Sequence, residues 1–205
     1  ATFRRVDAEN HKLIPENCRV TRALAMDVRR PLSVRGKYFG FLAQPDGWAS
    51  WWPAAVVQGL RLIRRHQISA IWSTYPIMTA HCIAHTLSRL TGLPWVADFR
   101  DPVVSSVDAG NRFSMVSQKH WEQRVLDRAS RIVFSTPGAM RDCARRYPQA
   151  ALGGRLVEIP NGYEVAVFGD LSPATPREPG QPLLLVHSGE LYLDGRNPVP
   201  FFTAL

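Results

Sequence analysis

The residues with the clearest chemical potential stand directly after short apolar segments of the chain. Asp98, Arg100 and Asp101 follow one such segment. Two carboxylates flanking a guanidinium can form an ion pair and can also hydrogen-bond hydroxyl groups, as the recognition of a sugar requires. A loop without a ligand can also be polar, but the paired carboxylates favour a ligand here. We therefore predict these three residues as the catalytic group.

Hydroxyl side chains stand at the ends of two further apolar segments. Ligands of open parallel sheets bind at the carboxyl ends of the strands, which is where these hydroxyl groups would gather. The alternative is that loop ends are polar without binding anything. We predict that the following residues line a ligand cleft: Ser73, Thr74, Tyr75, Ser135 and Thr136.

A glycine follows a fourth apolar segment, at residues 183–187. Ser188 and Gly189 come directly after it, and Arg196 lies where a helix is expected to begin. A glycine lets backbone N–H groups approach a phosphate, a helix N-terminus favours negative charge, and an arginine adds charge-assisted hydrogen bonds. We predict these three residues as a phosphate-binding group, although a tight turn without a ligand would look the same.

Metal and nucleophile chemistry have little support in the sequence. His81 and His85 are four residues apart on a predicted helix, a spacing that can bind metal, but no third ligand is evident. We expect them to be core or surface histidines. Cys18, Cys82 and Cys143 are widely spaced and predict reduced structural thiols. GxSxG, Walker and GxGxxG motifs are absent, although a glycine-rich loop could belong to the missing first strand. We expect no metal and no cofactor.

The elements that must position these groups alternate between strand and helix. Strands are predicted at residues 19–25, 68–73, 94–99, 132–135, 156–159 and 183–187. Helices are predicted at 53–66 with Ser50 as a possible cap, at 77–91 with Gly92 as the C-terminal cap, and at 112–129 and 137–147. This alternation is typical of βαβ units. It predicts an α/β fold, a Rossmann-like parallel sheet with helices on both faces.

The chain also divides into parts of different composition. Four prolines in the stretch 171–182 predict a linker, because proline fits neither a helix interior nor a central strand. A strand and a helix beginning at Asn197-Pro198 follow it. We predict one domain at residues 1–165, a linker at 166–182 and the first βα unit of a second domain at 183–205. The absence of an initiator methionine and the end inside a predicted helix favour a chain truncated at both ends, with its first strand upstream.

The composition of the chain limits the classes of molecule that it is expected to bind. The net charge is +8 and comes mostly from arginine, which favours anionic partners such as nucleotide diphosphates or acidic membrane surfaces. The basic residues are scattered rather than clustered in a tail, so nucleic acid is not expected. No run of 18 apolar residues predicts a transmembrane helix. Trp48, Trp51 and Trp52 precede an arginine-bearing helix and could either contact a membrane interface or pack into the domain.

Five strings in a fixed order resemble glycosyltransferase family 4, which has the GT-B fold. They are ISAIWSTYP at residues 68–76, LPWVADFRDP at 93–102, RIVFSTPGA at 131–139, IPNGY at 159–163 with Phe168, and HSGELYLDGRNP at 187–198. Each string alone has modest specificity, and their order makes the resemblance fairly specific. It covers most of residues 48–205, whereas residues 1–47 match weakly.

The resemblance implies two Rossmann-like domains that face a cleft. The N-terminal domain would bind an acceptor and the C-terminal domain a nucleotide-sugar, and transfer would retain the anomeric configuration without a metal. Gly189 and Arg196 would contact the donor diphosphate, and Asp98 to Asp101 would line the cleft. Arg100 stands where many members have a histidine, and the family's two-glutamate donor motif would lie beyond Leu205.

The function so implied is transfer of a sugar to a hydroxyl of a glycan or lipid-linked acceptor, in cell-envelope or polysaccharide synthesis. We expect a cytoplasmic location with peripheral contact at the inner membrane surface, and we expect residues 1–205 alone to be inactive. Two alternatives remain open. One is a non-catalytic binding module of the same fold, and the other is a sugar-nucleotide epimerase.

Overall fold

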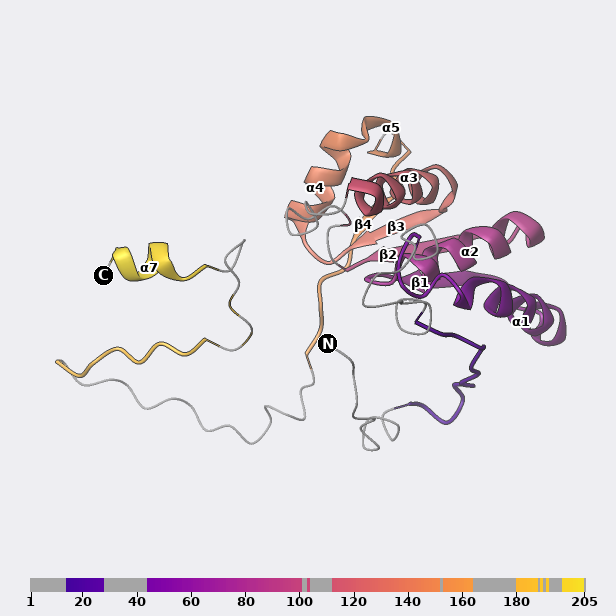
Figure 1. Ribbon diagram of the computed structural model, residues 1–205, viewed down its shortest axis with the longest axis horizontal. Helices are drawn as coiled ribbons and strands as arrows, with labels where there is room; N and C mark the ends of the chain where they lie inside the picture. Colours follow the sequence, from indigo (N-terminus) through magenta and orange to yellow (C-terminus); the bar gives the residue numbers. More distant parts are fainter. Residues whose placement is uncertain are drawn as a thin grey trace, which may run out of the picture.

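A computed structural model describes residues 14–27, 44–100, 103, 112–151, 153–163, 180–187, 189, 191 and 197–204 (Figure 1). Asp101, Ser188 and Arg196 lie outside the described residues, as does most of the predicted linker at 166–182.

Four strands and four longer helices alternate along the main body of the chain. The elements are α1 (Trp51–His66), β1 (Ile71–Thr74), α2 (Met78–Thr91), β2 (Trp95–Phe99), α3 (Arg112–Arg128), β3 (Arg131–Phe134), α4 (Pro137–Arg146), α5 (Pro148–Ala151), β4 (Leu156–Glu158) and α7 (Val199–Thr203). Each lies within a few residues of an element predicted from the sequence, except the short α5, which was not predicted.

The strands form one parallel sheet in the order β1-β2-β3-β4. Ile71 pairs with Trp95 at one end of the first ladder and Thr74 with Asp98 at the other, and Phe99 pairs with Phe134 in the next ladder. All four carboxyl ends therefore lie along the same edge of the sheet. The predicted Rossmann-like parallel sheet is confirmed.

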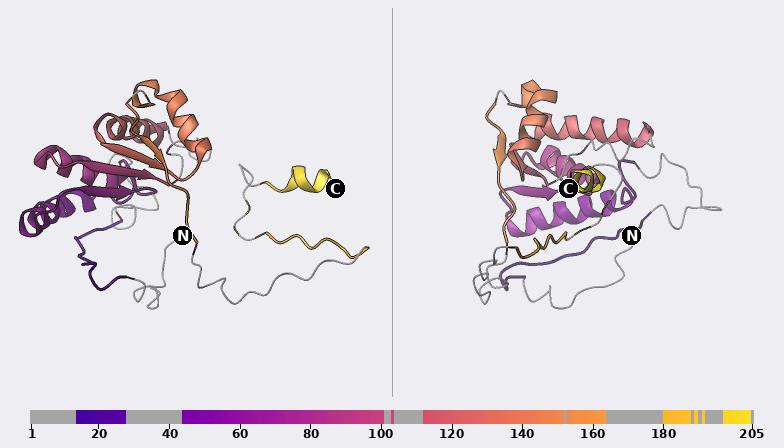
Figure 2. Two further views of the ribbon diagram at one scale, coloured as in Figure 1. Left: turned by 180° about the vertical axis from the view of Figure 1, so that it is seen from behind. Right: turned by 90° about the vertical axis from the view of Figure 1, so that its left-hand side faces the viewer.

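The crossover helices lie on one face of the sheet rather than on both (Figure 2, right). Strand order follows chain order, and βαβ crossovers share one hand, so α2, α3 and α4 are all placed on the same side. On the opposite face Trp72 of β1 is 58% exposed. Among the described residues, the expectation of helices on both faces is thus not met.

The core lies between the sheet and its helices. β2 alternates between buried and half-buried residues, and Trp95, Ala97 and Phe99 point into the core. They join buried residues of the neighbouring helices, among them Met78 of α2 and Leu126 of α3. This alternation decides which side chains at the strand ends face the helices.

The ends of α1 and α2 are closed in different ways. Gly92 has a positive φ of 74° and closes α2, as predicted. At the start of α2, Asp46 accepts hydrogen bonds from the backbone N–H and the hydroxyl of Thr79, both at 2.8 Å. Ser50 does not cap α1 with its side chain. Its hydroxyl donates to the carbonyl of Met26 instead, at 2.6 Å.

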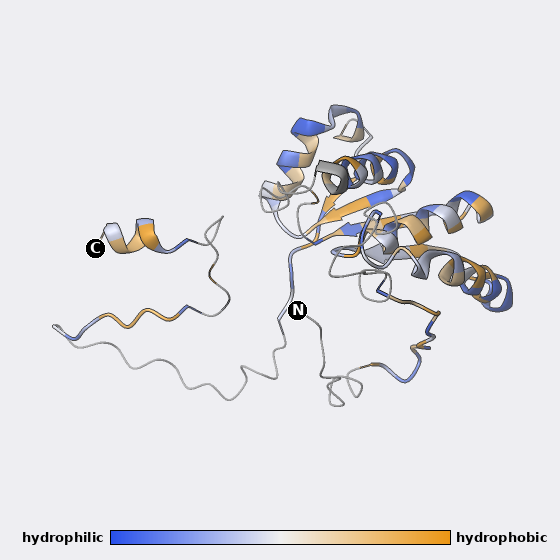
Figure 3. Ribbon diagram, in the orientation of Figure 1, coloured by the Kyte–Doolittle hydropathy of each residue, from blue (hydrophilic) through white to orange (hydrophobic). Residues whose placement is uncertain are grey.

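Two predicted strands are not formed. Residues 18–27 have no regular secondary structure and are largely exposed. Residues 181–187 are also irregular, and Leu183 to Val186, the apolar stretch drawn in orange before α7 in Figure 3, are 56–84% exposed. A strand needs a hydrogen-bonded neighbour, and neither segment pairs with a described strand. The helix expected after Asn197-Pro198 is present as α7.

Two of the cysteines are buried in the core, and Trp52 packs into the domain. Cys82 and Cys143 are buried, Cys18 is exposed, and all three are free thiols, as expected. Trp52 packs edge-on against Trp121 and donates from its indole nitrogen to the hydroxyl of Thr86 at 3.0 Å. No described helix is both long and apolar enough to cross a bilayer.

Candidate functional site

The ends of three neighbouring strands are tied together at the carboxyl edge of the sheet. Thr74 ends β1 and donates its hydroxyl to Oδ2 of Asp98, at 3.0 Å. Ser135 follows β3 and donates its hydroxyl to the carbonyl of Arg100, at 2.8 Å. These bonds hold polar groups of separate segments in fixed relative positions.

Two adjoining cavities open at this edge. One has a volume of about 470 Å³ and lies beside the start of α4, and the other has a volume of about 410 Å³ and lies beside Trp72 and Thr74. Both are lined by Arg100, Ser135 and Asn161. The strand ends thus form one continuous polar region with a hollow on either side.

Five of the predicted residues line these cavities. Thr74 and Asp98 line the smaller one, Thr136 lines the larger one, and Arg100 and Ser135 line both. The carboxyl-end argument therefore places them together, as expected from the sequence. Asp101 was predicted with them and lies outside the described residues.

Ser73 faces the core rather than the cleft predicted for it. It is 7% exposed, accepts a hydrogen bond from the indole nitrogen of Trp95 at 2.7 Å, and shares another at 2.7 Å with Nδ1 of His81. Successive strand residues point to opposite faces, so Ser73 turns inward where Thr74 turns outward.

Tyr75 is also a core residue, with 9% of its surface exposed. Its ring packs against Phe99 and lies parallel to the imidazole of His81. Its backbone N–H donates to the carbonyl of Asp98 at 3.0 Å, which continues the sheet by one bond. Tyr75 thus supports the edge of the sheet without lining either cavity.

His81 is a core histidine, as expected from the sequence. It is fully buried on α2, and burial lowers its pKa to about 3. Its Nε2 has no hydrogen-bond partner among the described residues. The side chain is therefore neutral at physiological pH and contributes packing and one hydrogen bond.

The N-terminus of α4 forms part of the larger cavity. Thr136 caps this helix by accepting a hydrogen bond from the N–H of Ala139 at 3.2 Å, and Pro137 occupies its first turn. Gly138 and Ala139 line the cavity. The first turn of a helix carries partial positive charge, so this wall favours a negatively charged or hydroxyl-bearing ligand.

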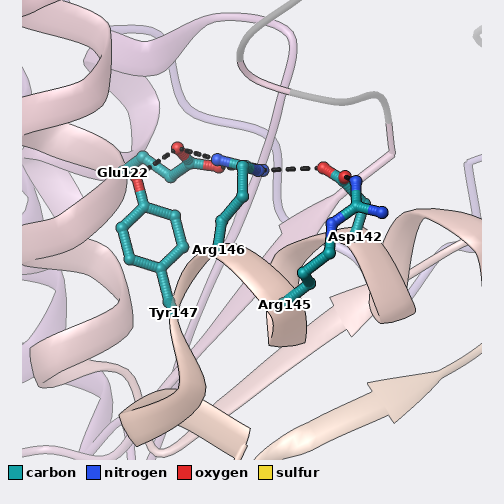
Figure 4. Close-up of polar contacts among 5 residues, drawn as sticks. All are labelled: Glu122, Asp142, Arg145, Arg146 and Tyr147. Carbon is teal, nitrogen blue, oxygen red and sulfur yellow. Dashed lines mark hydrogen bonds and ion pairs between the residues drawn. The ribbon is translucent and has the colours of Figure 1, made fainter.

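A partly buried ion pair also lines the larger cavity, and its contacts are drawn in Figure 4. Glu122 of α3 accepts two bonds from the guanidinium of Arg146, at 2.7 and 2.8 Å, and one from the hydroxyl of Tyr147 at 2.8 Å. Asp142 accepts from Nε of Arg146, also at 2.8 Å. The carboxylate of Glu122 is thus held between two helical segments.

The pKa values in this wall follow from the same contacts. The hydrogen bonds from Arg146 to Glu122 are the largest cause that raises the pKa of Arg146 above its ordinary value. Burial, together with the hydrogen bond to Glu122, raises the pKa of Tyr147 to about 12. Arg146 is therefore charged and Tyr147 neutral throughout the physiological range.

Sequence reasoning missed several of these residues. Asn161 follows β4, so the carboxyl-end argument applied to β1, β2 and β3 could have found it. Glu122 and Arg146 are different, because they lie within helices and no motif links them across the chain. Only the packing of α3 beside α4 brings them together.

The phosphate-binding group predicted near the end of the chain cannot be assembled from the described residues. Gly189 has a φ of 140°, a backbone conformation that favours glycine, whereas Ser188 and Arg196 lie outside the described part of the chain. The described residues contain no cluster of histidine, cysteine or carboxylate side chains that could hold a metal.

Comparison of the sequence with protein-family models identifies the kind of domain to which the carboxyl edge of the sheet belongs. Residues 13–162 match the model of the Glycosyl transferase 4-like domain. The chain belongs to this family. The match spans the parallel sheet, its helices and Asn161, so it confirms the resemblance found in the sequence. No curated protein shows significant sequence similarity to the chain.

Proposed function

We propose that the protein is a retaining glycosyltransferase that moves a sugar from a nucleotide-sugar to a hydroxyl of a glycan or lipid-linked acceptor. Membership of the glycosyltransferase 4-like family supports sugar transfer. The observation that carries the choice of site is the Thr74–Asp98 pair at the carboxyl edge of the sheet, beside a cavity. The described sheet would form the acceptor side.

Asp98 would position the acceptor. The hydroxyl of Thr74 occupies Oδ2, and Oδ1 has no hydrogen-bond partner among the described residues. A carboxylate oxygen in this state accepts a hydrogen bond from a sugar hydroxyl, and the bond fixes the direction in which that hydroxyl points. Holding the acceptor oxygen in line with the anomeric carbon supplies a large part of the rate in such transfers.

Arg100 would supply positive charge. Its side chain is exposed, lines both cavities and forms no ion pair with another described residue. A departing nucleoside diphosphate develops negative charge, and a fixed guanidinium stabilises it most as the bond breaks. Ser188, Gly189 and Arg196 would bind the same diphosphate from the second domain.

The wider setting is part of the same proposal. We assign the reaction to cell-envelope or polysaccharide synthesis in the cytoplasm, with peripheral contact at the inner membrane surface, and we expect no metal and no nucleic acid partner. The net charge of +8 supports an anionic co-substrate and an acidic surface.

The proposal is tested by sugar transfer with the whole protein. UDP-, GDP- and dTDP-sugars are offered with methyl glycosides and polyprenyl-phosphate-linked saccharides, and products are identified by mass spectrometry and anomeric NMR. A glycosylated acceptor with retained configuration is the expected product. Asp98→Asn should lower kcat/KM at least about tenfold, because one charge-assisted hydrogen bond is weakened. Glu16→Gln, an exposed carboxylate far along the chain from the edge, is the control.

Two other results would replace the proposal. Isomerised nucleotide-sugar formed without any acceptor would identify an epimerase. Saccharide binding without any product, from every donor and acceptor, would identify a binding module.

A further inference from the structure

A third hollow lies in the groove between α2 and α3. Its volume is about 540 Å³. It is lined by His85, Arg89, His120, Gln123, Arg124, Asp127 and Arg128. These residues belong to the later parts of two crossover helices, which run back from the carboxyl edge. The groove shares no lining residue with the cavities of the candidate site.

Two of its arginines are held in place by the surrounding structure. Arg128 donates to the carbonyl of Ser88 at 2.8 Å and to its hydroxyl at 3.3 Å. Arg124 donates from Nε to His120 at 2.8 Å, and its guanidinium lies 5.6 Å from the centre of the Trp121 ring. Side chains fixed in this way lose less conformational entropy when a ligand binds.

The charge of the groove is not balanced. Three arginines line it with one carboxylate, Asp127, and none of the four forms an ion pair with a described residue. The pKa of His85 also responds to these charges. Burial is the main cause that lowers this pKa, and the charges of Arg124, Arg128 and Arg89 lower it further. The three arginine charges, which add to the effect of burial on His85, also attract an anion to the groove.

We propose that the groove between α2 and α3 binds a phosphate-bearing anion, through the guanidinium groups of Arg89, Arg124 and Arg128. Guanidinium groups match the geometry and charge of phosphate oxygens, and three of them suit a group with more than one negative charge. The ligand can be a soluble phosphate or diphosphate or the headgroup of an acidic lipid, since both present the same oxygens. This site is separate from the proposed sugar-transfer site and does not depend on it.

Pyrophosphate and lipid vesicles are the two probes. The full chain is titrated with sodium pyrophosphate by calorimetry at constant ionic strength. It is also mixed with vesicles of phosphatidylcholine containing phosphatidylglycerol, and bound protein is measured by sedimentation. The test variant is Arg89→Gln with Arg124→Gln. The control variant is Arg61→Gln with Arg64→Gln, which removes two exposed arginines from α1. The control and test variants therefore have the same net charge.

The expected result is binding that weakens at least about tenfold in the Arg89/Arg124 variant and changes little in the Arg61/Arg64 variant, because charge-assisted hydrogen bonds are lost only in the first. Loss of pyrophosphate binding identifies a soluble ligand, and loss of vesicle binding alone identifies a lipid headgroup. Equal weakening in both variants would show a general charge effect and overturn the proposal. Absence of binding to both probes would also overturn it. Circular dichroism of each variant confirms that the fold is kept.

Discussion

Glu122 of α3 binds the guanidinium of Arg146 through both carboxylate oxygens, at 2.7 and 2.8 Å, although 24 residues separate them. The side chain of Glu122 is 4% exposed and that of Arg146 is 30% exposed. The pair joins α3 to the end of α4, beside the larger cavity of the carboxyl edge. It fixes the wall that a ligand in this cavity would meet.

Substitution of Glu122 by Gln tests this contact. The change leaves the partly buried arginine with only the more exposed carboxylate of Asp142, so we expect the free energy of unfolding to fall by roughly 1–3 kcal/mol. Denaturant unfolding followed by circular dichroism measures it. The matched control is Asp142→Asn, whose side chain is 40% exposed and whose ion pairs should contribute no more than about 1 kcal/mol. Equal losses in the two variants would show that burial of Glu122 is not what matters.

The stability of the protein should depend on the protonation of His81. Burial lowers its folded pKa to about 3, whereas an unfolded histidine titrates near its ordinary value of 6.5. Between these values only the unfolded chain binds the proton. The free energy of unfolding therefore decreases as the pH falls from about 6.5 to 3, by up to about 1.4 kcal/mol per pH unit.

His81→Asn isolates this contribution, because an amide can keep a polar atom near Ser73 without titrating. Denaturant unfolding at several pH values should give a shallower slope for the variant than for the wild-type chain. Parallel slopes would mean that His81 takes up its proton in the folded state.

Ser73 and Thr74 are neighbours with opposite roles. Ser73→Ala removes the partner of both the Trp95 indole and the His81 imidazole, so we expect it to lower the free energy of unfolding by about 1–3 kcal/mol. Thr74→Val, on the outward side, should cost less than about 1 kcal/mol, because its partner Asp98 can turn to water. Thermal unfolding of the two variants compares them. A larger loss for Thr74→Val would contradict the inward position of Ser73.

Ser73 and Thr74 also show how much of the fold and the site the sequence could predict. Apolar runs predicted all four strands of the sheet, and the carboxyl-end argument brought Thr74, Asp98 and Ser135 to one edge. It did not separate Ser73 from Thr74. Both carry a hydroxyl, and only the contacts of buried Ser73 with Trp95 and His81 show which of them faces inward.

Other features depend on contacts that local patterns do not encode. The strand predicted at residues 183–187 needs a neighbour, and the described residues contain none for it. The Glu122–Arg146 pair and the groove between α2 and α3 arise from helix packing. No short sequence motif therefore predicts them. The placement of the crossover helices on one face follows from the strand order, which the alternation of strands and helices left open.

Sugar binding at the carboxyl edge is the central claim, and ligand-detected NMR tests it most directly. Methyl glucoside, methyl mannoside and N-acetylglucosamine are used as probes with the full chain, and saturation transfer from protein to sugar is measured. We expect transfer to at least one probe, lost or weakened about tenfold or more in Asp98→Asn and retained in Glu16→Gln. Transfer that is equal in Asp98→Asn and the wild-type chain, or absent for every probe, would contradict the account.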